Sequence, residues 1–458
     1  MLMDKDGRAG KLNWPQLDWL IGQPADRLTS HEDNIAVRIP MGGLGVAEAK
    51  RILAAAIERH EALRTLVSDS PERVQRVSPV SQIASRLEAH TSVADVSRAG
   101  EAEKIIRATS FDLTRSWPVE FLLSTSGHDV VGITAVLDHF AADRWGADVL
   151  AEDIVTLSGR LGTGAPLTID RPALQPLDLS DWELSAKGRA HLRRGLDFWH
   201  KQFAEIGGHL GKAFGAEEMP FTRPDNDASY GSISVSSNRL LDVARAASAK
   251  LEVSLPCVFL SALGISLCLA NATPAVGIMM LFGNRYTLAS RGSVSKMFMQ
   301  APIVVTRPGP VSLSEVTTRC MRQIFPAGRF SHVDRTAIDT IRAEELPNAQ
   351  APSVSGVHLN FKEEGIPPDS GATAPWTISP APGQAILTEF RQGPTRRRGL
   401  ALHLEVVQFA NSVRLNLRSR NGTRWPAMSE ALLQRIAHVV LLMATDPDTR
   451  SLPLTPPA

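Results

Sequence analysis

A short polar stretch between two apolar ones carries the side chains best suited to chemistry. Residues 138–143 read Asp-His-Phe-Ala-Ala-Asp and follow an apolar run from Val130, whose β-branched residues predict a buried strand. Histidine titrates nearest neutrality, so His139 is a candidate general base or proton positioner. At the end of a rigid strand, its ring would be held in place while a proton moves.

The residues after this stretch predict a helix from Trp145 to Ile154. Apolar side chains at helical spacing indicate its buried face: Trp145, Val149, Leu150 and Ile154. Its acidic side chains fall elsewhere on the helix: Asp148, Glu152 and Asp153. Asp143 precedes the helix and is placed to cap its N-terminus through a side-chain oxygen. A strand, a polar loop and a helix in this order commonly position catalytic residues.

Length and composition set the broad class. At 458 residues the chain is too long for one ordinary core, so two domains are expected. Its 43% hydrophobic and 21% charged residues are those of a soluble globular protein. The formal net charge of +1 provides no field that would recruit nucleic acid or an anionic membrane. The chain has three cysteines, Cys257, Cys268 and Cys320, and their spacing matches no zinc-binding motif. These few cysteines and the polar N-terminus favour a protein of the reducing cytoplasm.

The uncharged stretch Val253–Gly283 is long enough to cross a bilayer, but Pro, Gly and Asn interrupt it and no basic flank anchors it. We interpret it as a buried helix at 256–269, a turn at 271–274 and a buried strand at 275–281.

Elsewhere the patterns predict strands at 34–39, 72–77 and 299–305, helices at 46–66, 102–108 and 427–444, and a hairpin of 400–408 with 413–418. Both halves therefore mix strands and helices without regular βαβ alternation, which indicates an α+β fold. The Gly- and Pro-rich stretch 159–181 marks the domain boundary.

Taken together, these features resemble the condensation domains of nonribosomal peptide synthetases, within the chloramphenicol-acetyltransferase-like superfamily. Residues 59–65, Arg-His-Glu-Ala-Leu-Arg-Thr, resemble the R-H-E-x-L-R-T motif, and residues 111–118 contain F-D-L with the following Pro. Residues 14–16, 197–199, 277–285 and 294–302 resemble four further motifs of the family in the expected order. The resemblance covers nearly the whole chain.

The resemblance implies two αβ sandwich lobes that form a V-shaped pseudo-dimer with a central tunnel, here residues 1–170 and 171–458. It implies a stand-alone, monomeric acyltransferase that joins an acyl thioester to an amine, giving an amide or, with another nucleophile, an ester. The acyl group would arrive on phosphopantetheine or coenzyme A, and an acyl or peptidyl carrier protein would be the partner. No metal and no other cofactor is implied. The setting would be specialised metabolism, with no nucleic acid and no membrane involved.

The signature motif of the family, H-H-x-x-x-D-G, is only partly kept. His139 and Asp143 match, but the first His is Asp138 and the Gly is Arg144. Asp138 and Asp143 also fit the D-x-x-x-x-D pattern of heterocyclization domains. Three functions therefore stay open: amide formation, an inactive docking module with the same fold, and a heterocyclizing or ester-forming enzyme that uses both aspartates.

The resemblance also assigns roles. His139 would accept the proton of the nucleophile, and Asp143 would pair with an arginine, with Arg285 the best match and Arg64 the other candidate. Trp145 and Gly146 would line the tunnel. Asp138 would either favour a charged His139 or point away from it along the strand, and Arg144 would be strained if its position requires a positive φ. The triplet Arg396, Arg397 and Arg398 would be a solvated loop or a contact to an acidic carrier.

Overall fold

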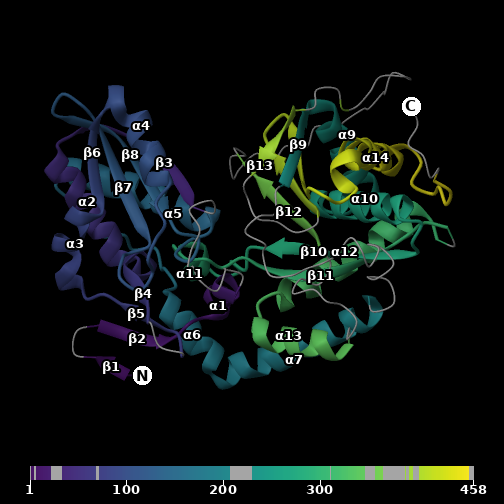
Figure 1. Cartoon of the computed structure of the whole chain (residues 1–458), viewed down its shortest axis with the longest axis horizontal. Helices are drawn as coiled ribbons and strands as arrows, with labels where there is room; N and C mark the ends of the chain where they lie inside the picture. The colour runs from purple at the N-terminus through teal and green to yellow at the C-terminus, as the bar shows by residue number, and fades with distance from the viewer. Residues whose placement is uncertain are drawn as a thin grey trace. The chain divides into compact units, whose positions relative to one another are not determined.

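The computed structural model describes residues 2–4, 7–21, 34–68, 72–206, 230–309, 311–345, 356–364, 387, 391–395 and 402–452. The chain divides into two units (Figure 1). The first contains Met1–Leu192 and Gly283–Met299, and the second contains Arg193–Phe282 and Gln300–Ala458. The sequence prediction divided the chain once, at 170, whereas the structure places residues 283–299 in the first unit.

The first unit is built on the four-stranded sheet β3-β8-β7-β6. Its strands are β3 (Ile35–Leu44), β8 (Asp129–Leu137), β7 (Val119–Ser126) and β6 (Thr91–Asp95), antiparallel except for β6 with β7. A second sheet, β1-β2-β5-β4, contains Leu2–Asp4, Gly7–Lys11, Val74–Val77 and Thr65–Val67. The helices of this unit are α1 (Trp14–Ile21), α2 (Val46–Arg59), α3 (Ile83–Ala89), α4 (Val96–Arg107), α5 (Arg144–Gly162), α6 (Pro176–Leu184) and α11 (Leu288–Arg291).

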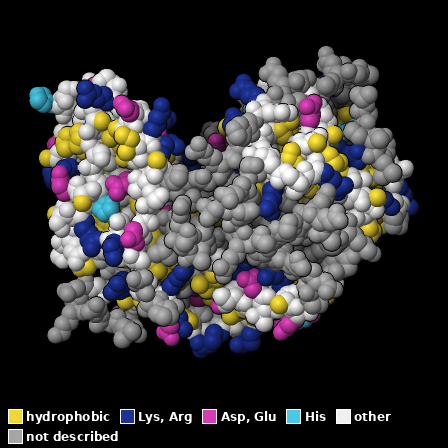
Figure 2. Space-filling view, in the orientation of Figure 1, with side chains coloured by type: hydrophobic (Ala, Val, Ile, Leu, Met, Phe, Trp, Pro, Cys, Tyr) yellow, Lys and Arg dark blue, Asp and Glu magenta, His cyan; other side chains and the backbone are white. Residues whose placement is uncertain are grey.

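The second half of strand β8, from Ile133 to Leu137, is buried and almost wholly apolar because both faces of its sheet are covered there. Ile133 and Leu137 pack into the core that α2 and α5 share, and Val136 packs into a second core with residues of α1 and α4. A strand buried on both sides reads as a continuous apolar run, which is the pattern that predicted this strand. On the visible face of the unit, basic and acidic side chains are interspersed (Figure 2), which fits the net charge of +1.

The second unit is built on a seven-stranded sheet, β11-β10-β12-β14-β15-β9-β13. In that order the strands are Met299–Thr306, Ala275–Phe282, Val357–Glu363, Leu402–Gln408, Val413–Arg420, Tyr230–Ser237 and Arg391–Thr395. The helices α9 (Asn238–Leu251), α10 (Leu255–Ala270) and α14 (Trp425–Thr445) pack together beside it (Figure 1). Two further helices, α12 (Leu313–Phe330) and α13 (Arg335–Glu345), lie between α10 and α14 in the sequence. Helix α7 (Ala186–Ile206) carries the chain from the first unit to the second.

The buried helix, turn and strand predicted within residues 253–283 are confirmed as α10 and β10, and the predicted hairpin is confirmed as β14 with β15. Among the described residues, α14 is the single helix long and apolar enough to cross a membrane, and half of its most apolar window is buried inside the structure. That burial is typical of a core helix.

Two helix predictions were wrong at their ends. The predicted helix 46–66 stops at Arg59, because His60 is extended (φ −110°, ψ 95°) and a 3-10 turn, Glu61–Arg64, follows. The predicted helix 102–108 begins earlier, at Val96, where the Asp95 carboxylate accepts a hydrogen bond from the Ser97 amide and caps the helix.

Candidate active site

The loop between β8 and α5 is a tight turn shaped by Asp138. The Asp138 amide donates to the Pro118 carbonyl at 3.0 Å, which continues the pairing with the strand beside β8. The Asp138 carboxylate accepts from the Phe140 amide at 2.7 Å, and its carbonyl accepts from the Ala141 amide at 3.0 Å. This is the local side-chain to backbone bonding that Asp favours in turns. The buried carboxylate therefore organises the loop.

His139 is half-buried, whereas Asp138 and Phe140 on either side of it are buried. Its Nδ1 atom lies 2.8 Å from the Ala142 carbonyl oxygen, which can only accept a hydrogen bond, so Nδ1 carries the proton. When the ring is neutral, this leaves the lone pair on Nε2. The rings of Trp19 and Phe298 flank the imidazole, with centroids 4.8 Å and 5.1 Å from its own. The Ala142 carbonyl and the two aromatic rings thus fix the orientation of the imidazole.

The Asp143 carboxylate accepts hydrogen bonds from α5, from Arg285 and from the backbone of residues 297–298. It is the N-cap of α5 and accepts from the Gly146 amide at 2.8 Å. The same Oδ1 atom accepts from Arg285 Nη2 at 2.7 Å, and Oδ2 accepts from the amides of Met297 and Phe298 at 2.9 Å and 3.3 Å. Four donors around one buried carboxylate leave it no role as a proton acceptor, so it holds the loop in place.

Arg285 organises the segment 283–299 from within. Its Nη1 atom donates to the carbonyls of Ser290 and Ser293 at 2.7 Å and 2.8 Å, and Nη2 donates to the Ser295 carbonyl at 2.7 Å. The preceding residue, Asn284, has φ 54°, a left-handed conformation that Asn tolerates. The segment thus folds around one guanidinium, which also binds Asp143. Its two ends continue into β10 and β11.

The other predicted residues lie as follows. Arg64 donates to the backbone carbonyls of Ile57, at 3.2 Å, and Ser78, so of the two candidates Arg285 is the partner of Asp143. Burial lowers the pKa of Arg64. Arg144 is the first residue of α5 and pairs with Asp148 at 3.0 Å. Its φ is not positive, so the condition under which Arg144 would be strained is not met.

Trp145 and Gly146 take different positions in the first turn of α5. The Trp145 side chain is 53% exposed, and its indole N–H donates to the Arg291 carbonyl at 3.0 Å. The prediction that Trp145 belongs to the buried face of the helix was therefore wrong. Gly146 is buried, and a Cβ atom there would lie 3.1 Å from the amide nitrogen and the carbonyl oxygen of Ser295. Glycine suits this position because a Cβ would force one of the two backbones to shift.

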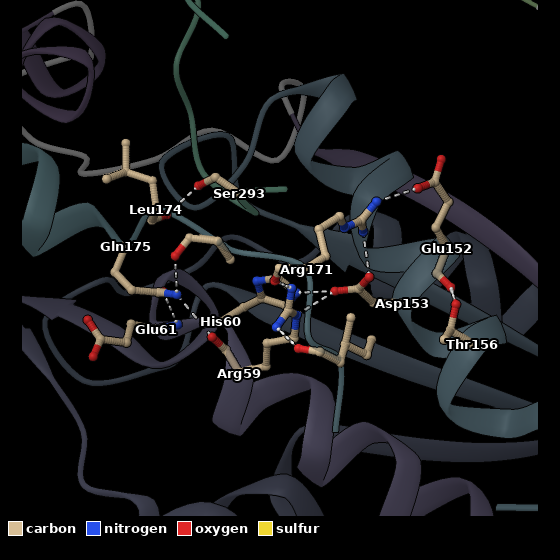
Figure 3. A network of polar contacts seen from close by, with 12 residues as sticks. Arg59, His60, Glu61, Glu152, Asp153, Thr156, Arg171, Leu174, Gln175 and Ser293 are labelled. Atoms are coloured by element: carbon tan, nitrogen blue, oxygen red, sulfur yellow. Dashed lines mark hydrogen bonds and ion pairs between the residues drawn. The ribbon is translucent and has the colours of Figure 1, made fainter. Parts of the chain in front are cut away.

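A second polar network surrounds Asp153, in the third turn of the same helix (Figure 3). Asp153 is buried, and it accepts from Arg59 and His60 at 2.8 Å each and from Arg171 at 2.6 Å. Burial lowers the pKa of His60. Burial acts to raise the pKa of Asp153, but the hydrogen bonds and charges of His60 and Arg59 hold it below its usual value. The prediction that Asp153 lies off the buried face was wrong, because these partners satisfy a buried carboxylate.

The network links the motif at residues 59–65 to the chain that follows α5. Gln175 accepts a hydrogen bond from the Glu61 amide at 3.0 Å and donates to the Arg59 carbonyl at 3.1 Å. The Ser293 hydroxyl donates to the Leu174 carbonyl at 2.6 Å (Figure 3). The motif therefore stabilises the scaffold behind the His139 loop.

Four residues near His139 were not predicted as site residues: Asp18, Trp19, Lys296 and Phe298. The first two lie on α1, where the sequence analysis assigned only residues 14–16 to a motif. The other two fall in the motif at 294–302, of which only the general resemblance was used. Lys296 is fully buried. No local pattern distinguishes it from a surface lysine.

The remaining candidates carry no catalytic arrangement. Burial raises the pKa of the Cys257 and Cys268 thiols to about 12 and that of Cys320 to about 11, so these cysteines are poor nucleophiles. Among the described residues, no group of three His, Cys, Asp or Glu side chains is placed to hold a metal ion. The triplet 396–398 lies outside the described residues.

Comparison with known proteins identifies the family. The family model "Condensation domain" matches residues 35–325, and the chain belongs to that family. It is 28% identical over 201 residues to the probable non-canonical nonribosomal peptide synthetase CymA of Salinispora arenicola, and 26% identical over 193 residues to enniatin synthetase of Fusarium oxysporum. Each alignment covers 41% of this chain, and they span 2% and 6% of the respective relatives.

Solved structures show the same fold. The X-domain from teicoplanin biosynthesis superposes with a TM-score of 0.71 at 18% identity, over 98% of this chain and 97% of its own. SgcC5 of Streptomyces globisporus gives 0.65 at 16% identity, over 96% of this chain and 100% of its own. A structure that describes condensation-domain-mediated chain release from the enacyloxin polyketide synthase gives 0.68 at 16% identity, over 99% and 86%. The predicted α+β, chloramphenicol-acetyltransferase-like fold and the resemblance found in the sequence are confirmed.

Proposed function

We propose that the chain is a condensation-type acyltransferase that joins a carrier-bound acyl thioester to an amine, with His139 as the proton acceptor. The observation that carries the proposal is the hydrogen bond from His139 Nδ1 to the Ala142 carbonyl, 2.8 Å long, which leaves the lone pair on Nε2. A half-buried imidazole in a fixed orientation, whose neutral form can accept a proton at Nε2, is the arrangement that general base catalysis requires.

The chemistry follows from that tautomer. The amine nitrogen forms a bond to the thioester carbonyl carbon, and its proton passes to His139 Nε2. The tetrahedral intermediate then expels sulfur as the C–S bond breaks, and the imidazolium returns the proton to the thiolate. The products are an amide and a free pantetheine thiol. An amine nucleophile needs less base assistance than a hydroxyl, so orientation of the attacking nitrogen is part of the role of His139.

A carrier protein as the acyl donor is supported by the exposed face of α12. Phe325 is 77% exposed there, and Met321 lies one helical turn before it. Two exposed arginines lie next to Phe325 at helical spacing, Arg322 three residues before it and Arg329 four residues after it. An apolar pair with basic neighbours suits a partner whose surface is acidic with an apolar patch.

The two alternatives stand differently. The hypothesis of a heterocyclizing or ester-forming enzyme needs Asp138 and Asp143 as reactive carboxylates. Both are buried, and both accept hydrogen bonds from backbone amides of the loop and the helix start. The inactive docking module is favoured by the replacement of the first signature His with Asp138. X-domains, which share this fold, include one that was solved in a complex with OxyB. The two readings are distinguished by turnover.

The test is acyl transfer from loaded carrier protein to a panel of amines, with amide detected by mass spectrometry. We expect His139→Ala to lose about 10²- to 10⁴-fold in rate. The matched control is His128→Ala, which removes an exposed histidine from the turn between β7 and β8 and should change nothing. Undiminished turnover by the His139 variant would refute the base role. No amide from the wild type with any pair would favour the docking module.

A further inference from the structure

Lys296 is a fully buried lysine in the same cluster as His139. Its side chain is 0% exposed, and Nζ lies 3.4 Å from Asp18 Oδ2 and 3.2 Å from the Phe298 carbonyl oxygen. Nζ is also 4.4 Å from the centroid of the Phe298 ring, and the His139 ring is 5.1 Å from that centroid. A buried cation and the candidate base therefore contact the same phenyl ring.

The contacts of Lys296 connect both aromatic neighbours of the imidazole. Asp18 precedes Trp19 in α1, and the Trp19 ring is 4.8 Å from that of His139. The Phe298 carbonyl and ring supply the other contacts. A buried ammonium loses its hydration, so it persists only where a carboxylate, carbonyls or a π face compensate for that loss. Lys296 thus ties α1 to residues 296–298, with His139 between their rings.

Charged side chains lie beside His139 in the sequence, beside a residue whose ring contacts it, or in the pair that anchors its loop. The loop supplies Asp138, α1 supplies Asp18, and the Asp143 carboxylate is paired with Arg285 at 2.7 Å. Arg285 is paired with Asp143, so within this group Lys296 is the cation that offsets the negative charges of Asp18 and Asp138. Carboxylates near an imidazole favour its protonated form, which cannot accept a proton, and a nearby ammonium opposes them.

We infer that Lys296 is a positioning residue for the transfer reaction: it fixes the two rings on His139 and, as a buried counter-charge, keeps the imidazole neutral at working pH. The inference rests on the proposed function for its catalytic meaning. It also accounts for the Asp at position 138, because a carboxylate next to the base is tolerated where a cation offsets it. Lys296 acts through His139 and contacts no reacting atom.

The test is an NMR titration of His139 in full-length protein labelled with ¹³C-histidine, with the resonance assigned by His139→Gln. Lys296→Met removes the charge and keeps the length of the side chain, and Lys296→Arg restores the charge. We expect the proton affinity of His139 to rise about tenfold in Lys296→Met and to return toward wild type in Lys296→Arg. Asp18→Asn should lower it.

An unchanged His139 titration in Lys296→Met would overturn the inference. If Lys296→Met fails to fold, Asp18→Asn decides, and an unchanged titration there has the same meaning. The titration does not depend on turnover, so it separates the two proposals. A shifted titration in a protein that makes no amide supports the role of Lys296 and counts against the proposed function. In an active protein, the acid limb of the pH–rate profile should move with the titration.

Discussion

Replacing Asp143 with Asn removes the charge that opposes Arg285 while keeping the shape of the side chain. The two side chains are 7% and 4% exposed and 2.7 Å apart. At an effective dielectric constant of about 20, the Coulomb energy at that distance is roughly 6 kcal/mol, which is a ceiling because both ions are also desolvated. The amide also presents an NH₂ group to backbone donors, either Gly146 or Met297 and Phe298. We expect a loss of about 3–5 kcal/mol in the stability of this part of the first unit.

Two measurements check the size and the place of that loss. Urea denaturation, followed by tryptophan fluorescence, gives the change in stability. Amide hydrogen exchange shows whether protection is lost in residues 283–299 and in the first turn of α5. The matched control is Arg144→Gln in that same turn, because Arg144 and Asp148 form an exposed pair at 3.0 Å. Such i, i+4 pairs contribute about 0.3–0.5 kcal/mol.

The reasoning would be refuted if Asp143→Asn cost no more than Arg144→Gln. It would also be refuted if exchange in residues 283–299 stayed at the wild-type rate. Either result would mean that the Arg285 guanidinium is compensated well enough by the carbonyls of Ser290, Ser293 and Ser295, which accept from it at 2.7–2.8 Å.

Two further predictions concern α5 and its neighbours. Gly146→Ala should lower the free energy of unfolding by about 1–3 kcal/mol, because the new Cβ meets the Ser295 backbone at 3.1 Å. The control, Gly159→Ala in the same helix, meets nothing within 4 Å and should raise it by about 0.5–1 kcal/mol. Equal denaturation midpoints for the two variants would contradict this prediction. Burial lowers the pKa of His60, so the unfolded chain binds this proton more tightly and stability should fall as pH drops below about 6.5. The fall in urea midpoint between pH 7.5 and 5.5 should be smaller in His60→Gln, and an equal fall would show that His60 contributes no such dependence.

Local sequence patterns predicted the frame of the site well. The apolar run before Asp138 and the helix after Asp143 correspond to β8 and α5, because both elements are fixed by which residues are apolar and by their spacing. The partner of Asp143 was also predicted as Arg285, although 142 residues separate the two. That prediction came from a family motif, since no local pattern relates residues so far apart.

What the sequence did not predict depends on packing between distant segments. The apolar spacing of α5 placed Trp145 inside and Asp153 outside, and the structure has the reverse. Asp153 is buried because Arg59, His60 and Arg171 meet it there, and two of these lie more than 90 residues away. The same limit applies to Lys296, which reads as a surface residue until Asp18 is known to lie beside it.

The three acidic and basic positions of the signature loop perform separate physical tasks, and this separation bears on the departure at position 138. Asp138 shapes the turn through the Phe140 amide, His139 presents Nε2, and Asp143 binds the amides of Met297 and Phe298. The Phe298 ring lies 5.1 Å from the imidazole, so the hydrogen bond between Asp143 and the Phe298 amide also fixes the position of an aromatic neighbour of the base. The contacts that orient His139 come from Ala142, Trp19 and Phe298 and not from position 138, so Asp in place of the first signature His changes the charge beside the base and keeps these contacts, and the proposed counter-charge of Lys296 addresses that change.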